Sequence, residues 1–204
     1  IRWLHPGGAG PRRIPRPLDT RIPLPHPIKE IFVKAPPAPQ RLPFMSSENR
    51  MIPPDRLTDW RNQLRRDGKK LVVTNGCFDL LHVGHVTYLE QARALGASLT
   101  VAVNSDASVR RLGKGGDRPI NPLDDRMAVL AALACVDLVV AFDDDTPRAL
   151  IVACMPEILA KGGDYTAATT AGAAEVVAAG GRFVAVPFAY DRSTTALIAR
   201  VRGR

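Results

Sequence analysis

The chain has 204 residues and a formal net charge of +8, which allows one ordinary domain and a short additional segment. Residues 1–44 carry +6 of this charge, because they hold eight Lys and Arg against two acidic residues, so the rest of the chain carries only +2. The body therefore lacks the basic surface of a nucleic-acid binder, and no apolar run approaches the roughly 20 residues of a membrane helix. Three cysteines without a C-x-x-C pairing indicate reduced thiols, and we expect a cytoplasmic protein that binds neither nucleic acid nor membrane.

Residues 1–44 differ in composition from the remainder. They contain eleven of the eighteen prolines, and their apolar residues follow neither a helical nor a strand period. This composition favours disorder or extended polyproline-like segments. We expect a disordered or non-native leader ahead of a natural start at Met45 or Met51, with a functional basic tail as the alternative. Residues 45–204 form the predicted folded domain.

Beyond Pro54, predicted helices alternate with apolar strands. Helices are expected over residues 56–66, 83–96, 122–134, 147–154, 168–179 and 194–202. Strands are expected over residues 71–75, 99–104, 136–142, 158–161 and 183–187. Strands that are apolar throughout and alternate with helices indicate a parallel sheet covered on both faces. We predict an α/β fold, a single Rossmann-like doubly wound domain with a mostly parallel five-stranded sheet.

Two of the predicted helix starts carry a capping signal. Asn121 and Thr146 each stand directly before a proline, which suits the first position of a helix. The acidic run 143–145 is open to a metal-site interpretation, but acidic residues ahead of a helix N-terminus need no metal. We favour the capping interpretation.

The segment 74–85 reads TNGCFDLLHVGH and joins a predicted strand to a predicted helix. Such a turn at the carboxyl end of a parallel strand is where α/β proteins bind ligands. His82 and His85 stand at the helix start, whose free N–H groups and dipole favour phosphate. A zinc site requires further ligands, and the chain has neither a C-x-x-C pair nor another histidine outside residues 1–44. The segment therefore predicts a phosphate site.

A phosphate site of this kind suits in-line attack at the α-phosphorus of a nucleoside triphosphate. Fixed N–H donors, imidazoles and Mg²⁺ stabilise the negative charge of the transition state without covalent catalysis. A sugar phosphate, with a second pKa of about 6, is already largely a dianion at neutral pH and needs no general base. We predict a nucleotidyltransferase in which the triphosphate binds Mg²⁺ and no protein side chain is a ligand of the metal.

The segment from Gly76 to His85 resembles the H-x-G-H signature of the cytidylyltransferase-like nucleotidyltransferases. Further motifs follow in order: VNSD at 103–106, RPINP at 118–122, DDR at 124–126, DTP at 145–147, KGGDY at 161–165 and STT at 193–195. Together they resemble the D-glycero-β-D-manno-heptose 1-phosphate adenylyltransferases, which make ADP-heptose for the lipopolysaccharide inner core. The resemblance spans about residues 56–202; the H-x-G-H signature alone indicates only the superfamily.

This resemblance implies a reaction and a set of residue roles. AMP would pass from ATP to the heptose 1-phosphate with Mg²⁺ as cofactor, and pyrophosphate would leave. His82 and His85 would contact the triphosphate and stabilise the transition state. The implied nucleotide-binding residues are Gly76, Cys77, Phe78, Lys161, Gly162, Asp164, Ser193, Thr194 and Thr195. Candidates for contact with the sugar phosphate or the triphosphate are Asp79, Asn104, Lys114 and Arg126.

The same resemblance bears on partners and alternatives. Many relatives fuse this domain to a sugar kinase, and since the chain shows no kinase segment we expect a separate heptose kinase upstream; a homodimer stays open. The nearest alternative is a CTP-dependent transferase acting on glycerol 3-phosphate or a related phospho-alcohol, which commonly carries an RTxGI element absent here. A remote alternative is a non-catalytic basic nucleic-acid binder, supported only by residues 1–44.

Two segments depart from the family pattern. The loop 112–117 is one residue longer than usual, which leaves the place of Lys114 open. Asp191 and Arg192 stand where relatives commonly have a glycine and a small or aromatic residue. These differences concern the substrate details and not the reaction class.

Overall fold

The structure is a computed structural model that describes residues 46–113, 117–190 and 192–203. The predictions for residues 1–44 and for Lys114 fall outside these ranges. Within them, no helix has the length and apolar character needed to cross a membrane.

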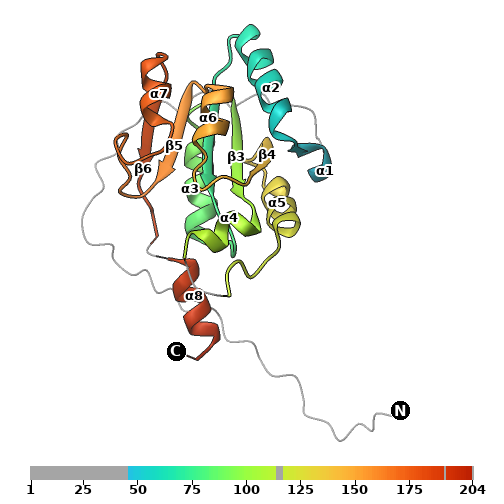
Figure 1. Cartoon of the computed structure of the whole chain (residues 1–204), viewed down its shortest axis with the longest axis vertical. Helices are drawn as coiled ribbons and strands as arrows, with labels where there is room; N and C mark the ends of the chain where they lie inside the picture. The colour runs from blue at the N-terminus through green and yellow to red at the C-terminus, as the bar shows by residue number, and fades with distance from the viewer. Residues whose placement is uncertain (1–45, 114–116, 191, 204) are drawn as a thin grey trace, which may run out of the picture. The chain divides into compact units, whose positions relative to one another are not determined.

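A six-stranded parallel sheet forms the centre of the described domain (Figure 1). Its strands are β1 (Met51–Ile52), β2 (Leu71–Gly76), β3 (Ser98–Asn104), β4 (Leu138–Phe142), β5 (Ile158–Gly162) and β6 (Arg182–Val186). They lie in the order β1-β4-β3-β2-β5-β6, and each neighbouring pair is parallel. The predicted Rossmann-like, doubly wound α/β fold is confirmed.

The prediction of five strands was wrong by one. Strand β1 has only two residues and is defined by its pairing with β4, where Met51 lies opposite Val139. So short a strand shows no alternation in its own sequence, and only the partner strand reveals it.

The described helices are α1 (Ser47–Arg50), α2 (Pro54–Arg66), α3 (Val83–Arg93), α4 (Asp106–Arg111), α5 (Leu123–Ala132), α6 (Arg148–Cys154), α7 (Ala173–Ala178) and α8 (Thr194–Val201). Helices α1 and α4 were not predicted, because each is shorter than two turns and gives no periodic pattern. Helix α7 is shorter than the predicted 168–179, since Gly172, at φ +84°, precedes its first turn.

The two expected helix caps were wrong. Helices α5 and α6 begin directly after Pro122 and Pro147, and neither has a side-chain cap. The side chain of Asn121 instead donates a hydrogen bond of 2.6 Å to the carbonyl oxygen of Asp79. Asn121 therefore fixes the turn after β2 rather than the start of α5.

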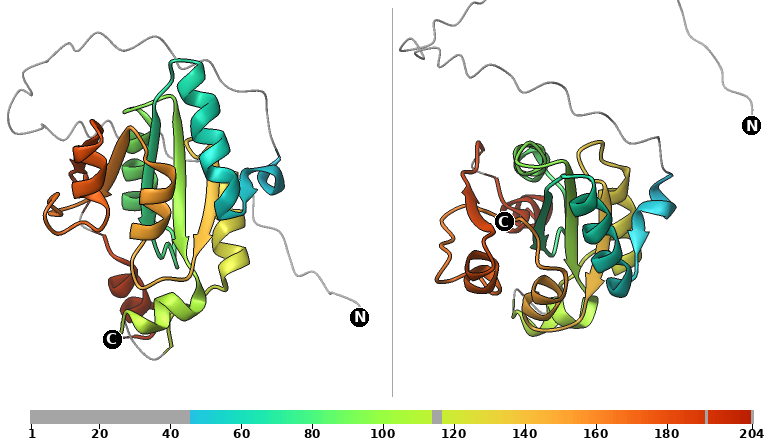
Figure 2. Two further views of the ribbon diagram at one scale, coloured as in Figure 1. Left: turned by 45° about the horizontal axis from the view of Figure 1, so that its top comes forward. Right: turned by 90° about the horizontal axis from the view of Figure 1, so that it is seen from above.

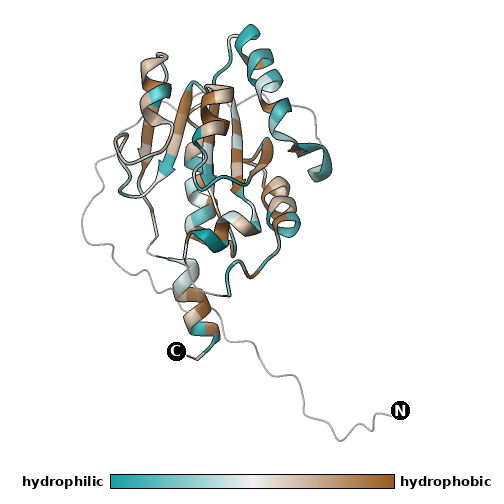
Figure 3. Ribbon diagram, viewed as in Figure 1, coloured by the Kyte–Doolittle hydropathy of each residue, from teal (hydrophilic) through white to brown (hydrophobic). Residues whose placement is uncertain are grey.

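Alternate side chains of the buried strands pack against opposite helical layers. In β2, Val72 belongs to the cluster covered by α3 and α5, whereas Leu71 and Val73 belong to the cluster covered by α2, α6 and α7 (Figure 2). The strands are mainly hydrophobic, while α2 presents many polar residues (Figure 3). Burial on both faces explains why the central strands are mainly apolar rather than alternating.

The strand order creates a crevice at the carboxyl end of β2. The chain continues from β2 to β3 on one side, whereas β5, on the other side of β2, is reached from β4 through α6. Ligands bind at such a switch point in open α/β sheets. Helix α8 lies beyond the carboxyl ends of the strands, and none of its residues is buried (Figure 1).

Candidate active site

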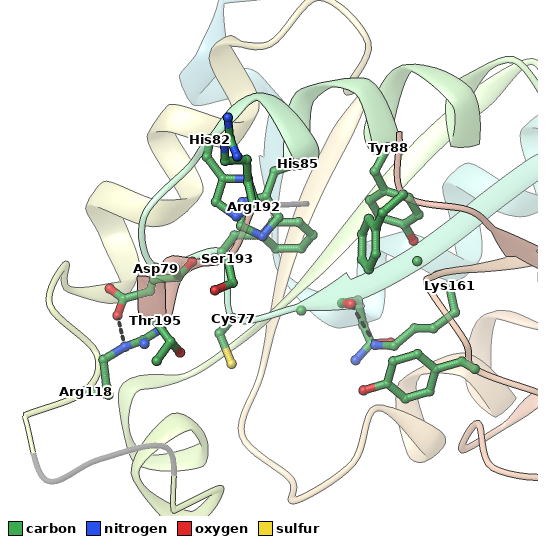
Figure 4. Close-up of a pocket in the computed structure, with 17 residues that line it drawn as sticks. Cys77, Asp79, His82, His85, Tyr88, Arg118, Lys161, Arg192, Ser193 and Thr195 are labelled. Atoms are coloured by element: carbon green, nitrogen blue, oxygen red, sulfur yellow. Dashed lines mark hydrogen bonds and ion pairs between the residues drawn. The ribbon is translucent and has the colours of Figure 1, made fainter. Parts of the chain in front are cut away.

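A cavity of about 330 Å³ opens at the carboxyl end of β2 (Figure 4). Its walls come from the turn after β2, the first turns of α3, the end of β5 and the residues that lead into α8. These segments are far apart in the sequence and meet only because the parallel strands end at one edge of the sheet.

Two stacked imidazoles stand at one side of this cavity. The rings of His82 and His85 are 3.9 Å apart between centroids and inclined by 23°. Within the described residues, the Nδ1 atoms of both rings are buried and have no hydrogen-bond partner. Burial lowers the pKa of His82, and burial together with the charge of His82 lowers the pKa of His85 to about 4. Both rings are therefore neutral at neutral pH, and a bound anion would favour their protonation.

The turn after β2 is shaped around Phe78. This residue has φ +47°, and its ring meets that of His85 edge-on at 5.3 Å. A Cβ atom on Gly76 would lie 2.9 Å from the same ring, so a larger residue at this position would displace it. The strained backbone of Phe78 and the bare backbone of Gly76 thus set the position of the second imidazole.

Buried ionic contacts brace the turn from below. The carboxylate of Asp79 pairs with Arg118 and accepts backbone hydrogen bonds from Ile120 and Asn121 at 2.8 and 2.9 Å. The guanidinium of Arg126 donates to the carbonyl of Cys77 at 2.7 Å and, from its other atoms, to Asn121 and Asp106. The negative charge of Asp79 is therefore compensated within the protein.

Helix α8 presents its N-terminus to the same cavity. The hydroxyl of Ser193 accepts a hydrogen bond from the amide of Ala196, which caps the helix. The hydroxyl of Thr194 donates to the carbonyl of Leu80 and so connects α8 to the turn after β2. The free N–H groups and positive dipole ends of α3 and α8 therefore converge on one space, as an anionic ligand requires.

The opposite end of the cavity is aromatic. The Nζ of Lys161 donates to both oxygens of Asn75, at 3.0 and 2.9 Å, and lies 5.0 Å from the centroid of the Tyr165 ring. The ring of Phe188 rests on the backbone of β5, since a Cβ atom on Gly162 or Gly163 would lie 2.7 or 2.8 Å from it. Phe188 is 55% exposed, so part of its ring remains open to a flat ligand.

Comparison with known families now identifies the chain. Residues 73–199 match the model of the family described as cytidylyltransferase-like. The chain belongs to the cytidylyltransferase-like family. It is a nucleotidyltransferase, as its sequence predicted.

Individual relatives refine this family assignment. The D-beta-D-heptose 1-phosphate adenylyltransferase of Bordetella bronchiseptica is 58% identical over 134 residues, which cover 66% of this chain and 83% of that protein. The bifunctional protein HldE of Shewanella sp. strain ANA-3 is 51% identical over 154 residues, covering 76% of this chain but 32% of that protein. The predicted resemblance to the heptose 1-phosphate adenylyltransferases is therefore confirmed.

A solved structure agrees. The lipopolysaccharide core biosynthesis protein of Thermoplasma volcanium GSS1 superposes with a TM-score of 0.51 at 28% identity. The match covers 61% of this chain and 100% of that one. The fold of that solved chain is therefore matched by about three fifths of this chain.

Most of the predicted site residues line the cavity at the carboxyl end of β2. Those that do are Gly76, Cys77, Phe78, Asp79, His82, His85, Lys161, Gly162, Ser193, Thr194 and Thr195. Asp164 lines a neighbouring open groove with Phe188 and Tyr190. Asn104 lines a second cavity, and Arg126 lines none of the cavities described here, because its guanidinium is buried beneath the turn. The catalytic and binding roles of all these residues stay predictions.

The structure adds lining residues that received no role from the sequence. Arg118 lies in the RPINP motif, and this motif could have marked it as a candidate site residue. Its partner Asp79 is 39 positions away, so the sequence does not reveal the pairing. Phe188 lines the cavity from a segment without helical or strand period, so nothing in its own sequence marked it.

Proposed function

We propose that this nucleotidyltransferase transfers AMP from ATP to D-glycero-β-D-manno-heptose 1-phosphate, giving ADP-heptose and pyrophosphate. The observation that carries the proposal is the convergence of α3, α8 and two imidazoles on a cavity whose lining carboxylate, Asp79, is already neutralised. Such a cavity favours a highly charged anion. The Bordetella relative, named for a heptose 1-phosphate, supports the choice of acceptor.

The proposed step is a direct displacement. A phosphate oxygen of the acceptor forms the new bond to the α-phosphorus, and the bond to the bridging oxygen breaks as pyrophosphate leaves with the electron pair. No proton has to be removed from the nucleophile. His82 and His85 donate hydrogen bonds to the triphosphate, where negative charge develops, and the helix N-termini add fixed positive potential.

The cavity suits a magnesium ion that arrives with its substrate. Among the described lining residues Asp79 is the only carboxylate, and Arg118 and two backbone amides occupy it. No group of three or more His, Cys, Asp or Glu in the described ranges is placed to hold a metal. We propose that phosphate oxygens and water hold Mg²⁺, which when bound neutralises part of the charge on the triphosphate.

We assign the nucleoside to the aromatic end of the cavity. Phe188 offers an open ring face there, and a stacked base contributes about 1–3 kcal/mol in other proteins. Lys161 and Asp164 flank the Gly162–Gly163 turn and are proposed to contact the ribose or base. This arrangement leaves the triphosphate pointing toward the histidines.

The upstream reaction is part of the proposal. A kinase must place the phosphate on carbon 1 of the heptose before this step, and the chain spans about a third of the length of the bifunctional relatives it matches. We propose that a heptose kinase activity acts upstream, and that the protein forms a homodimer in a reducing cytoplasm, the last in keeping with the free cysteines at 77, 135 and 154.

The test is a pyrophosphate-release assay that crosses ATP, CTP, GTP and UTP with heptose 1-phosphate, glycerol 3-phosphate and other phosphate esters. We expect turnover with ATP and heptose 1-phosphate. Activity with CTP and glycerol 3-phosphate instead would replace this proposal by the cytidylyltransferase alternative. Absence of activity with every pair would contradict catalysis at this site.

A further inference from the structure

A second cavity of about 240 Å³ adjoins the first. Its walls come from the ends of β2, β3 and β5, the segment between β4 and α6, and residues 169–171. The residues that line both cavities are Asn75, Gly76, Cys77, Lys161 and Tyr165. These five residues, here called the shared wall, separate two compartments at the switch point of the sheet.

The second cavity has a different chemistry from the first. Among the residues that line it but not the first cavity, Leu112, Pro147 and Ala171 are apolar, and the others offer amide, hydroxyl and carboxylate groups: Asn104, Asp145, Thr146, Thr169 and Thr170. It contains neither the histidines nor the start of α8. The exposed carboxylate of Asp145 opposes a triphosphate but accepts hydrogen bonds from hydroxyl groups. This lining suits a polyol.

The walls of this cavity are held by hydrogen bonds of the protein itself. Asn104, which is 4% exposed, accepts a weak contact from the Cys77 thiol at 3.8 Å and donates to the Ser108 hydroxyl at 3.0 Å. Ser108 in turn donates to the carbonyl of Asp144 at 2.8 Å. Arg111 holds Asp145 through a contact of 2.6 Å. The lining groups are thus positioned before any ligand binds, which lowers the entropy cost of binding.

Resting on the proposed function, we infer that the second cavity binds the sugar of the acceptor, with its phosphate at the shared wall. The ammonium group of Lys161 stands in that wall and attracts a phosphate dianion. A triphosphate in the first cavity and a sugar phosphate entering from the second would approach the α-phosphorus from different compartments. In-line displacement requires the attacking oxygen and the leaving pyrophosphate to lie on opposite sides of the phosphorus, and separate compartments are compatible with this.

Filling the second cavity tests the inference. We expect Thr146→Trp to raise the KM for heptose 1-phosphate by more than about tenfold, because the ring occupies space that the sugar needs, and to change the KM for ATP by less than about twofold. Val152→Trp is the matched control, since it places the same ring on the exposed side of α6, outside both cavities.

Two conservative variants keep the test informative if Thr146→Trp fails to fold. Thr146→Val removes a hydroxyl and Asp145→Asn removes a charge at nearly constant volume. Each is expected to raise the KM for the sugar phosphate roughly three- to tenfold, the value of one hydrogen bond, with the KM for ATP unchanged. An unchanged KM for the sugar phosphate in all folded variants would overturn the inference.

The outcomes separate this inference from the proposed function. If wild type uses heptose 1-phosphate but the variants alter only the KM for ATP, the second cavity belongs to the nucleotide and the inference is wrong while the function stands. If wild type adenylylates a different phosphate ester and the variants raise its KM, the heptose assignment fails while the acceptor cavity stands.

Discussion

Helices α3 and α8 both direct their N-termini at the first cavity, but they are anchored in opposite ways. Helix α3 buries Gly84, Tyr88, Leu89 and Ala92, and three of these side chains belong to a core cluster of the sheet. Helix α8 buries none of its residues and is attached through the hydrogen bond from Thr194 and an ion pair between its C-cap residue Arg202 and Asp117. Folding of the core therefore forms the α3 half of the site, whereas a bound phosphate is expected to add more stability to the α8 half than to the α3 half.

Removing an imidazole from the α3 half should have the largest effect. We expect His85→Asn to lower kcat by about 10²–10⁴-fold, because a donor to the developing charge is lost at a site that the core keeps in shape. Pyrophosphate release gives kcat, and circular dichroism checks that the fold persists. A variant with near-normal kcat would contradict the role proposed for His85.

The buried contacts of Asp79 should contribute to the stability of the α3 half of the site. We expect Asp79→Asn to lower the free energy of unfolding by about 3 kcal/mol, since it leaves the buried Arg118 without its counter-charge. Urea denaturation measures this loss. Asp59→Asn, which breaks an exposed pair with Arg56, should cost less than about 0.5 kcal/mol and serves as the control. Equal losses would show that Asp79 does not brace the turn.

The pH dependence of stability should also report on the α3 half. The pKa of His85 falls from 6.5 to about 4 on folding, so above pH 6.5 the ring is neutral in both states. Between pH 6.5 and 4 the unfolded ring binds a proton that the folded ring does not, and stability falls as pH falls. We expect a contribution of about 2 kcal/mol, because solvent reaches the half-buried ring. Thermal melts should show a shallower decline for His85→Asn; an identical decline would contradict this assignment.

In the α8 half, ligand binding should change amide protection strongly, whereas mutation should change stability little. We expect Thr194→Val to raise the KM for ATP by about two- to fivefold, since one partly buried hydrogen bond at the end of the domain is lost, without a measurable change in melting temperature. Hydrogen exchange should show that ATP protects the amides of α8 much more than those of α3. Equal added protection of both helices would remove the distinction between the two halves.

The elements best predicted from sequence were those whose own residues carry the signal. Strands β2 and β3 were predicted to within one residue because each contains a buried run rich in Leu and Val. Strand β1 and helix α4 were missed because their length leaves no period. Local pattern therefore predicted the layers of the fold but not its shortest elements.

Site residues in a contiguous motif were likewise predicted, whereas contacts between distant segments were not. His82 and His85 were identifiable because they lie in one contiguous motif, and the structure brings the Ser193–Thr195 segment to them. Arg126 follows two acidic residues at a helix start, a context that is typical of a solvent-exposed or phosphate-binding side chain. Its actual partner, the carbonyl of Cys77, is 49 positions away, and that contact exists only after the sheet has formed.

The shared wall has a kinetic consequence. If the second cavity holds the sugar as inferred above, the two compartments on either side of the shared wall accept both substrates at once, and the enzyme has no need to carry the adenylyl group on one of its own atoms. Initial-rate plots at several fixed concentrations of the second substrate should therefore intersect instead of running parallel. With ATP that is chiral at the α-phosphorus, the product should have the inverted configuration at this atom, because a single displacement inverts it once.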